Sequence, residues 1–330
     1  MSFVQFGLSE AYRTVRGLGD RLALMKEQID WAPFKSIVKR VFYNHTNLGG
    51  RPNTDELVVV RCLLLQGWYG LSDEELEYQI NDRLSFRNFV GFPDKVPDFT
   101  TIWKIRERLQ KTTAEQKIWK EIQKQLDTKG YTIKEGVIQD ATIIQADLGR
   151  KRYYKEKKAK QKGEKITYTP KQTSHIDKDG SFTKKYGQVS YGYKNHIKLD
   201  VDHHLIRSYE VTTASLHDSQ IDLTKKDDVA AWRDKGYCGT KIAKGITDHT
   251  MKRATKNKKL NGGEQKRNKT ISSKRAPGER PFAVTKRVFH GARTFVKTLI
   301  RVKIKEMFKC FAYNLYQLVT LRKKELATAL

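Results

Sequence analysis

Three acidic residues are placed where a folded chain can hold a carboxylate for chemistry. Asp140 lies inside the apolar run at 136–144, and burying a lone carboxylate is costly unless a cation, a metal or hydrogen-bond donors face it. Asp234 follows a second short apolar run, and Glu279 lies two residues before Pro281, which can occupy the first turn of a helix. Two carboxylates on neighbouring strands and a third on a later helix match the arrangement in which two metal ions support in-line attack on a phosphodiester.

Other charged residues nearby are either alternative candidates for the same role or could act together with these acids. Asp227 and Asp228 precede the second apolar run and are typical of a helix-to-strand loop, whereas Asp218 could cap a helix. Lys286 follows Glu279 by seven residues, so the two would share one helical face, two turns apart, and could hold a phosphate and a metal. A turn aspartate or a surface ion pair is the ordinary alternative for these positions.

The charge of the chain indicates a polyanionic partner. Its 330 residues include 65 Lys and Arg against 37 Asp and Glu, giving a formal charge of +28. A hydrophobic content of 38% excludes a disordered basic tail, so the charge must lie on a folded body. Two basic segments, 150–171 and 252–275, are predicted to be loops that become ordered on a phosphate backbone. The phosphate-binding candidates in the first are Lys151, Arg152, Lys155, Lys157 and Lys158.

Cysteine usage and the N-terminus indicate an intracellular protein. Cys62, Cys238 and Cys310 form no C-x-x-C pair, which argues against a disulfide framework or a thiolate zinc site and favours a reducing compartment. The first residues lack the pattern of a secretory signal, and the longest apolar stretch, at 57–65, is interrupted by Arg61. We therefore expect a cytoplasmic protein without a membrane segment.

The N-terminal third has the periodicity of helices. Apolar residues recur at three- and four-residue spacing through 20–130, and Gly and Pro at 49–53 mark a break before one helix. Ser72, with Glu three residues later, forms a capping-box pattern, and Asp98 or Thr100 is placed to cap a further helix. This part is therefore predicted to be a small all-α domain.

One of these helices carries three basic residues on an amphipathic frame, Lys104, Arg106 and Arg108. An exposed basic helix is the usual element that enters the major groove of a nucleic acid. The alternative is a packing helix whose charged face is merely solvated.

After residue 130 the pattern changes to short β-rich runs. Strands are predicted at 137–144, 189–201, 205–211 and 229–232, with a hairpin joining the second and third and helix-like sequence between the last two. From 281 onward the apolar residues return to a helical period and form a long amphipathic stretch. The simplest architecture is mixed α/β, a sheet with flanking helices.

Several other chemistries are excluded, because the chain has no G-x-x-x-x-G-K-[ST], no strand-linked G-x-G-x-x-G, no G-x-S-x-G and no H-E-x-x-H. In order and spacing, its short motifs resemble those of the DDE transposases of the IS5 family of bacterial and archaeal insertion sequences. The matching features are Gly50-Arg51-Pro52, Leu63-Leu64-Leu65-Gln66, Val96-Pro97-Asp98-Phe99-Thr100-Thr101, Asp140-Ala141-Thr142, Tyr191-Gly192-Tyr193-Lys194, His217-Asp218-Ser219, Asp234-Lys235-Gly236-Tyr237, Glu279-Arg280-Pro281-Phe282-Ala283-Val284 and Tyr313-Asn314-Leu315.

The resemblance implies a fold and a metal site. An RNase H-like catalytic core would occupy 131–330, after a helical domain at 1–130 that serves DNA-end binding or assembly. Asp140, Asp234 and Glu279 would form the DDE triad and hold two Mg²⁺ ions, with Mn²⁺ able to substitute.

A second family signature, Y-(2)-R-(3)-E-(6)-K, is met in part. Arg275 and Lys286 stand at the expected offsets from Glu279, and the resemblance implies that both bind DNA. Ser272 stands where the Tyr should be, so an aromatic contact to the transposon end is not expected there.

The implied activity is cleavage at terminal inverted repeats followed by strand transfer into target DNA. Its partners would be double-stranded DNA and further copies of the chain, as a homodimer or higher oligomer, in the cytoplasm and on the nucleoid when DNA is bound. Two alternatives stay open: a catalytically silent, domesticated protein that binds terminal repeats, and an RNase H-like nuclease that cuts without strand transfer.

Overall fold

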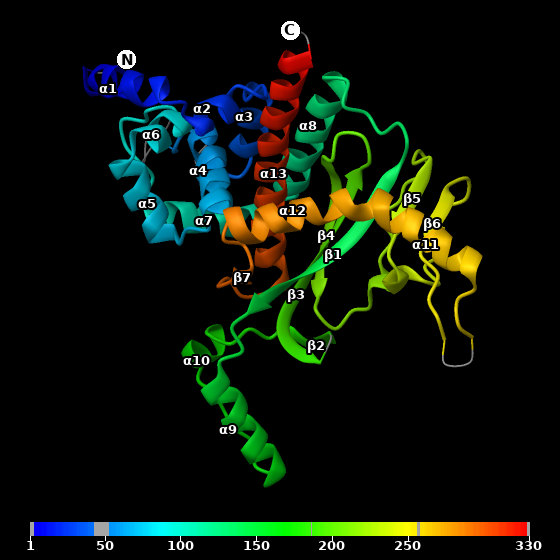
Figure 1. The fold of residues 1–330 in the computed structure, drawn as a ribbon. Coiled ribbons are helices and arrows are strands. Elements are labelled where there is room, and N and C mark those ends of the chain that lie inside the picture. The colour runs from blue at the N-terminus through cyan, green and yellow to red at the C-terminus, as the bar shows by residue number, and fades with distance from the viewer. Residues whose placement is uncertain (1–2, 43–52, 186, 256–257, 329–330) are drawn as a thin grey trace.

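The N-terminal part of the chain is helical, as predicted from its periodicity. The structure, a computed structural model, describes residues 3–42, 53–185, 187–255 and 258–328. Helices gather on one side of the molecule (Figure 1). They are α1 (Phe3–Gly17), α2 (Arg21–Lys26), α3 (Ala32–Lys39), α4 (Glu56–Tyr69), α5 (Asp73–Asp82), α6 (Leu84–Val90), α7 (Phe99–Lys111) and α8 (Ala114–Thr128).

Side-chain caps fix where two of these helices begin. The Ser72 hydroxyl accepts a hydrogen bond from the Glu75 backbone N–H over 3.1 Å at the start of α5. Asp98 caps α7, because its carboxylate accepts from the Thr101 N–H over 2.7 Å. Both predicted start signals are therefore confirmed, and Asp98 rather than Thr100 is the cap. The expected break at Gly50-Arg51-Pro52 lies outside the described residues.

The described strands after residue 130 form one mixed sheet in the order β2-β3-β1-β5-β6, with β4 beside β3 and β7 beside β1. β3 pairs antiparallel with both β1 and β4, whereas β5 runs parallel to β1 and β6 parallel to β5. This is the RNase H-like arrangement. The strands are β1 (Val137–Ala146), β2 (Ser181–Lys185), β3 (Gln188–Asp200), β4 (Ile206–Thr213), β5 (Ala230–Arg233), β6 (Thr247–Thr250) and β7 (Arg293–Thr294).

All four predicted strands are present, and β3 and β4 form the predicted hairpin. The prediction of a helix between β4 and β5 is wrong. Residues 214–229 are all described, and the helical structure among them is a single 3₁₀ turn at Asp218–Gln220. Instead, the buried Gln139 amide of β1 donates to the Ile221 carbonyl over 2.8 Å and accepts from the Leu223 N–H over 3.3 Å. These bonds satisfy an extended backbone without a helix.

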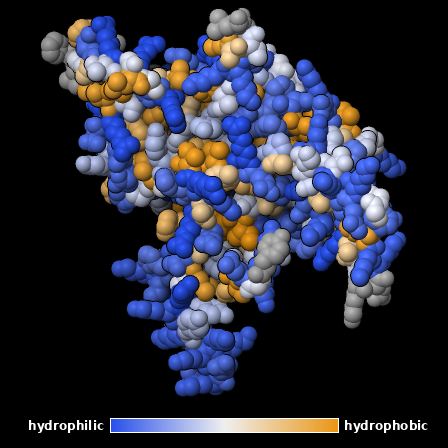
Figure 2. Space-filling view, viewed as in Figure 1, coloured by the Kyte–Doolittle hydropathy of each residue, from blue (hydrophilic) through white to orange (hydrophobic). Residues whose placement is uncertain are grey.

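The two basic segments are loops only in part, contrary to the prediction that they are loops throughout. The first contains α9 (Arg150–Gln161) and α10 (Pro170–Ser174), and the second contains α11 (Gly262–Arg275). Lys and Arg are good helix formers, and Asn261 with Glu264 forms a capping box at the start of α11. α9 projects from the body as an arm (Figure 1), and hydrophilic residues cover it (Figure 2).

The C-terminal region differs from the single amphipathic stretch that was predicted. Helix α12 (Glu279–Ala283), a π-helical turn (Val284–Val288) and β7 come before the long helix α13 (Leu299–Thr328). The middle of α13, at 306–315, is buried on every side, because the helix packs against α4 on one side and β4 on the other. Asn314 ties it to the sheet by accepting from the Ile206 N–H and donating to the Ile206 carbonyl. One hydrophobic core therefore includes residues of the N-terminal helices, the sheet and α13.

Candidate active site

Asp140 and Asp234 lie side by side because β1 and β5 are parallel neighbours. Gln139 of β1 is in register with Arg233 of β5, so the two aspartates that follow them reach the same level of the sheet. The Ala141 N–H donates to Asp140 Oδ1 over 2.8 Å, and the Gly236 N–H donates to Asp234 Oδ1 over 2.7 Å. Local backbone donors thus fix both carboxylates.

Arg275, the last residue of α11, forms an ion pair with Asp140. Its Nη2 lies 2.9 Å from Asp140 Oδ2, and both side chains are largely buried. Burial raises the pKa of Asp140 to about 6, the Arg275 charge opposes this rise, and the negative charge of Asp234 adds to it. A positive charge beside Asp140 is therefore stabilising, and Arg275 supplies one in this structure.

Glu279 is brought toward β1 by a close backbone approach. α11, a short 3₁₀ turn and α12 follow one another and cross the sheet (Figure 1). Gly278 touches Ile138 of β1, because a Cβ on Gly278 would lie 2.7 Å from Ile138 Cγ2. Ile138 and Asp140 share one face of the strand, so Glu279 starts α12 on the side of Asp140, with its own side chain exposed.

The predicted face shared by Glu279 and Lys286 is altered by the helix geometry. Residues Val284–Val288 form a π-helical turn, so seven residues no longer make two α-helical turns. Lys286 is half-buried and lines a small cavity with Thr142, two residues beyond Asp140. Burial lowers the pKa of Lys286, and the Lys185 charge lowers it further.

The donor set at the two aspartates suits a hard divalent ion such as Mg²⁺, which prefers carboxylate oxygens. The stabilising effect of positive charge at Asp140 agrees with this. Nevertheless, no three His, Cys, Asp or Glu side chains in the described part of the chain are grouped closely enough to hold a metal. The structure brings Asp140 and Asp234 together, while Glu279 stays outside that pair.

Two further residues at this end of the sheet were not singled out from the sequence for chemistry. Asp218, whose expected role was a helix cap, begins a 3₁₀ turn capped by His217, and its carboxylate accepts from Lys194 Nζ over 2.9 Å. Tyr237 is buried, and burial with the charges of Asp140, Asp218 and Asp234 raises the pKa of its phenol. Both stand in short motifs that carry the resemblance, His217-Asp218-Ser219 and Asp234-Lys235-Gly236-Tyr237, and these motifs are the sequence signal for them.

Asp227 and Asp228, the alternative candidates to Asp234, lie in different environments. Asp228 is buried and forms an ion pair with Lys198, whose Nζ lies 2.9 Å from Asp228 Oδ2. Asp227 is exposed just before β5. The structure thus gives Asp228 a structural role as the buried partner of Lys198.

The three candidate basic residues of α7 differ in how far they are buried. The expectation that Arg106 belongs to an exposed basic face is wrong, because it is buried and forms two hydrogen bonds to Asp73, of 2.6 and 2.7 Å. Lys104 is exposed and Arg108 is half-buried. The basic face of α7 is therefore narrower than its sequence indicates.

Most of the candidates in α9 face solvent. Arg152 is the exception, since it pairs with Glu156 over 2.8 Å and donates to the Leu148 carbonyl. The exposed members are Lys151, Lys155, Lys157 and Lys158.

Comparison with known families decides what this site belongs to. Residues 131–315 match the family described as Transposase DDE domain, and residues 9–108 match Transposase domain (DUF772). The chain is a DDE transposase. No solved structure matched it. The transposase is thus a polynucleotidyl transferase or endonuclease that acts on DNA, and among its described residues no helix is long and apolar enough to span a membrane.

Proposed function

We propose that this transposase belongs to the IS5 family and mobilises an insertion sequence. It cleaves DNA at the terminal inverted repeats of the element and joins the freed 3′ ends to target double-stranded DNA. The observation that carries the proposal is the placement of Asp140 and Asp234 at the same level of two adjacent parallel strands. Such a pair, with a third acid from α12, is suited to phosphoryl transfer.

In this proposal Asp140, Asp234 and Glu279 are the ligands of two Mg²⁺ ions, for which Mn²⁺ can substitute. When bound, such ions activate the attacking oxygen and stabilise the leaving oxygen. The chain itself positions the acids: backbone N–H groups orient both aspartates, and the contact of Gly278 with Ile138 sets the start of α12. Arg275 balances the charge of Asp140 in this structure, and its guanidinium would be free to contact a DNA phosphate if Asp140 held an ion.

The DNA partner is proposed to contact the basic residues outside the acid pair. The exposed lysines of α9 supply phosphate contacts that carry little sequence information, and Lys286, which lines a small cavity with Thr142, is proposed to contact a DNA phosphate as well. Lys104 and Arg108 of α7 are proposed to contact the terminal repeat. Because two ends must be paired, we propose a homodimer or higher oligomer that acts on the nucleoid in the cytoplasm.

A two-step assay with the full chain tests this function. One substrate is a duplex that carries the inverted repeat found beside the reading frame, and the other is the same end already cut at the 3′ strand. We expect Mg²⁺-dependent cleavage of the first and joining of the second to plasmid DNA. Cleavage without joining would identify an RNase H-like nuclease, and repeat binding without either reaction would identify a catalytically silent DNA-binding protein.

A further inference from the structure

An open groove lies where the α9 arm joins the body. It has a volume of about 860 Å³ and is bounded by the end of β1, the first turn of α9, β2, β3 and the segment around β7. β7 pairs with the last two residues of β1, so this segment is attached to the catalytic sheet. Apolar residues gather at the base of the arm, next to its hydrophilic surface (Figure 2).

Aromatic rings line this groove and are exposed to solvent. Phe295 is 79% exposed, Tyr154 58% and Phe182 41%. Phe182 also contacts Tyr153 and Tyr191, with ring centroids 5.5 and 5.0 Å apart. Exposing large apolar rings to water is unfavourable, and a contiguous set of them is typical of a binding surface.

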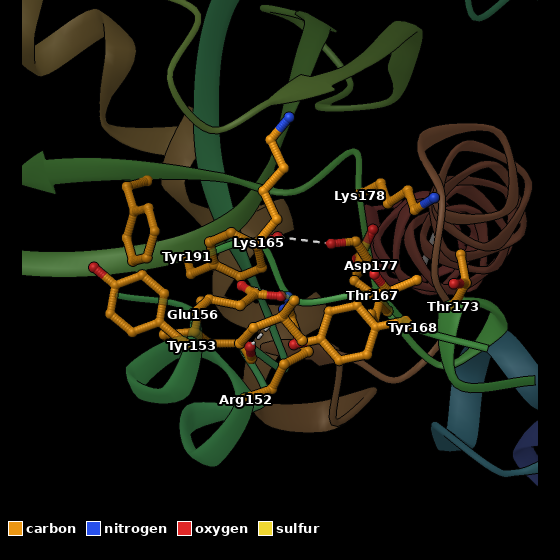
Figure 3. Close-up of a pocket in the computed structure, with 14 residues that line it drawn as sticks. Arg152, Tyr153, Glu156, Lys165, Thr167, Tyr168, Thr173, Asp177, Lys178 and Tyr191 are labelled. Atoms are coloured by element: carbon orange, nitrogen blue, oxygen red, sulfur yellow. Dashed lines mark hydrogen bonds and ion pairs between the residues drawn. The ribbon is translucent and has the colours of Figure 1, made fainter. Parts of the chain in front are cut away.

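A second cavity, of about 720 Å³, shares Tyr153, Phe182 and Tyr191 with the groove (Figure 3). There the Tyr191 hydroxyl donates to the Asp177 carbonyl over 3.0 Å, and Arg152 forms an ion pair with Glu156. These contacts hold the wall in place. The open groove thus presents Phe182 in an orientation that its contacts with Tyr153 and Tyr191 fix.

The charge of the groove favours an anionic ligand. Arg150 and Arg293 line it, and Arg293 Nε lies 3.2 Å from Gln145 Oε1. The acid of the lining, Asp147, uses Oδ1 to accept from the Gly149 N–H over 2.9 Å. The exposed lysines of α9 continue the positive charge along the arm.

We propose that this groove binds unpaired nucleotides of a DNA strand, with bases stacked on Phe182, Phe295 and Tyr154 and phosphates bound by Arg150 and Arg293. A stacking ring needs a free base face, which paired and stacked bases of a duplex do not offer, whereas single strands do. The inference rests on the proposed function, because cleavage frees a strand end. The groove begins at Gln145, five residues along β1 from Asp140, or about 17 Å.

Binding of a single-stranded oligonucleotide that carries 2-aminopurine, measured on the full chain without metal, tests the proposal. We expect the fluorescence of the base analogue to be quenched on binding. Phe295→Ala and Phe182→Ala should each weaken binding by at least about fivefold and reduce the quenching. Phe295→Trp should retain both. Tyr78→Ala on α5 is the control, since Tyr78 is 63% exposed and belongs to neither cavity.

The outcomes separate this proposal from the proposed function. If the groove variants bind the single strand as wild type does, the groove proposal is wrong even when the protein cleaves and joins DNA. If instead they lose only self-association in sedimentation equilibrium, the rings bind a second copy of the chain and the proposal is also wrong. Asp140→Asn should lose cleavage but bind and quench the single strand normally, so a variant that quenches normally and still cleaves would contradict the proposed function and leave the groove proposal intact.

Discussion

Arg275 donates from Nη2 to Oδ2 of Asp140 over 2.9 Å, so a basic residue of the chain neutralises the carboxylate that is proposed to bind metal. The two residues are 135 positions apart and come from a helix and a strand. The ion pair joins α11 to β1 at the level of Asp234. It also means that a metal ion at Asp140 must compete with a guanidinium.

Removing this guanidinium should change how the protein responds to metal. Arg275→Ala is expected to lower the free energy of unfolding by about 1–3 kcal/mol, because a largely buried carboxylate loses a charge-assisted hydrogen bond. Mg²⁺ should then raise the melting temperature of the variant more than that of the wild type, since Asp140 is vacated. Thermal unfolding with and without Mg²⁺ measures both effects. Arg287→Ala, an exposed neighbour, is the control, and equal Mg²⁺ stabilisation of all three proteins would show that Arg275 does not compete with the ion.

The close approach of Gly278 to Ile138 predicts a second effect. Gly278→Ala places a methyl group 2.7 Å from Ile138 Cγ2, so α12 and Glu279 must shift away from β1. We expect DNA cleavage to fall roughly tenfold to a hundredfold, because small displacements of catalytic groups are costly. The protein should remain folded with a loss of about 1–3 kcal/mol in unfolding free energy.

Cleavage rates and circular dichroism of this variant provide the measurement. Gly262→Ala is the matched control, because a Cβ on Gly262 meets nothing within 4 Å. A Gly278→Ala protein that cleaves at the wild-type rate would contradict the proposed role of this contact in positioning Glu279.

The α9 lysines should provide affinity without sequence choice. Replacing the four exposed lysines of α9 by Ala is expected to weaken binding to all duplexes alike and to reduce the salt slope by roughly one for each DNA phosphate that is no longer neutralised. Fluorescence anisotropy over a salt series measures both quantities. The four substitutions are Lys151→Ala, Lys155→Ala, Lys157→Ala and Lys158→Ala.

Four exposed lysines in α8 and at its C-terminal end serve as the matched control for charge. Their replacement should leave the affinity and the slope nearly unchanged if α9 is the arm that contacts DNA. A loss limited to the terminal repeat in the α9 variant would show that the arm reads bases. The control residues are Lys117, Lys120, Lys124 and Lys129.

Some parts of this site could be predicted from the sequence, and others could not. The apolar runs around Asp140 and Asp234 predicted their strands correctly, because buried parallel strands are continuous apolar runs. β6 was missed because Thr247–Thr250 contains no apolar residue, and its pairing with β5 depends on distant sequence.

Tertiary partners explain the remaining differences. The sequence of α7 suggests that Arg106 is solvated, but Asp73 lies beside it only in the folded chain. In the same way, the spacing of Arg275 and Glu279 indicated a shared role but not the ion pair with Asp140. Composition also missed the helices in 150–171 and 252–275: α10 and α11 begin at capping boxes, whereas α9 has no side-chain cap and forms from a run of good helix formers.

His196 should make the stability of the protein depend on pH. It is fully buried on β3, its Nε2 lies 3.0 Å from the Thr212 hydroxyl, and burial lowers its pKa to about 4. The unfolded chain has an ordinary histidine pKa near 6.5. The contribution to stability is therefore complete above about pH 6.5 and is lost as the pH falls toward 4, to a total of about 3 kcal/mol.

Urea unfolding between pH 4 and 8 measures this dependence. His196→Gln should lose less stability over that range than the wild type, because Gln does not titrate. His175→Gln, which replaces an exposed histidine, should follow the wild-type curve. Parallel curves for His196→Gln and the wild type would show that His196 is protonated equally in the folded and unfolded states.

The most direct test of the account compares cleavage and end binding for Asp140→Asn, Asp234→Asn and Glu279→Gln, with Asp227→Asn as the control. We predict that each triad variant loses Mg²⁺-dependent cleavage completely, while its affinity for the transposon end stays near that of the wild type, because the phosphate contacts lie elsewhere. The control should cleave normally. Normal cleavage by Asp234→Asn, together with inactivity of a folded Asp228→Asn protein, would contradict the assignment of the second acid.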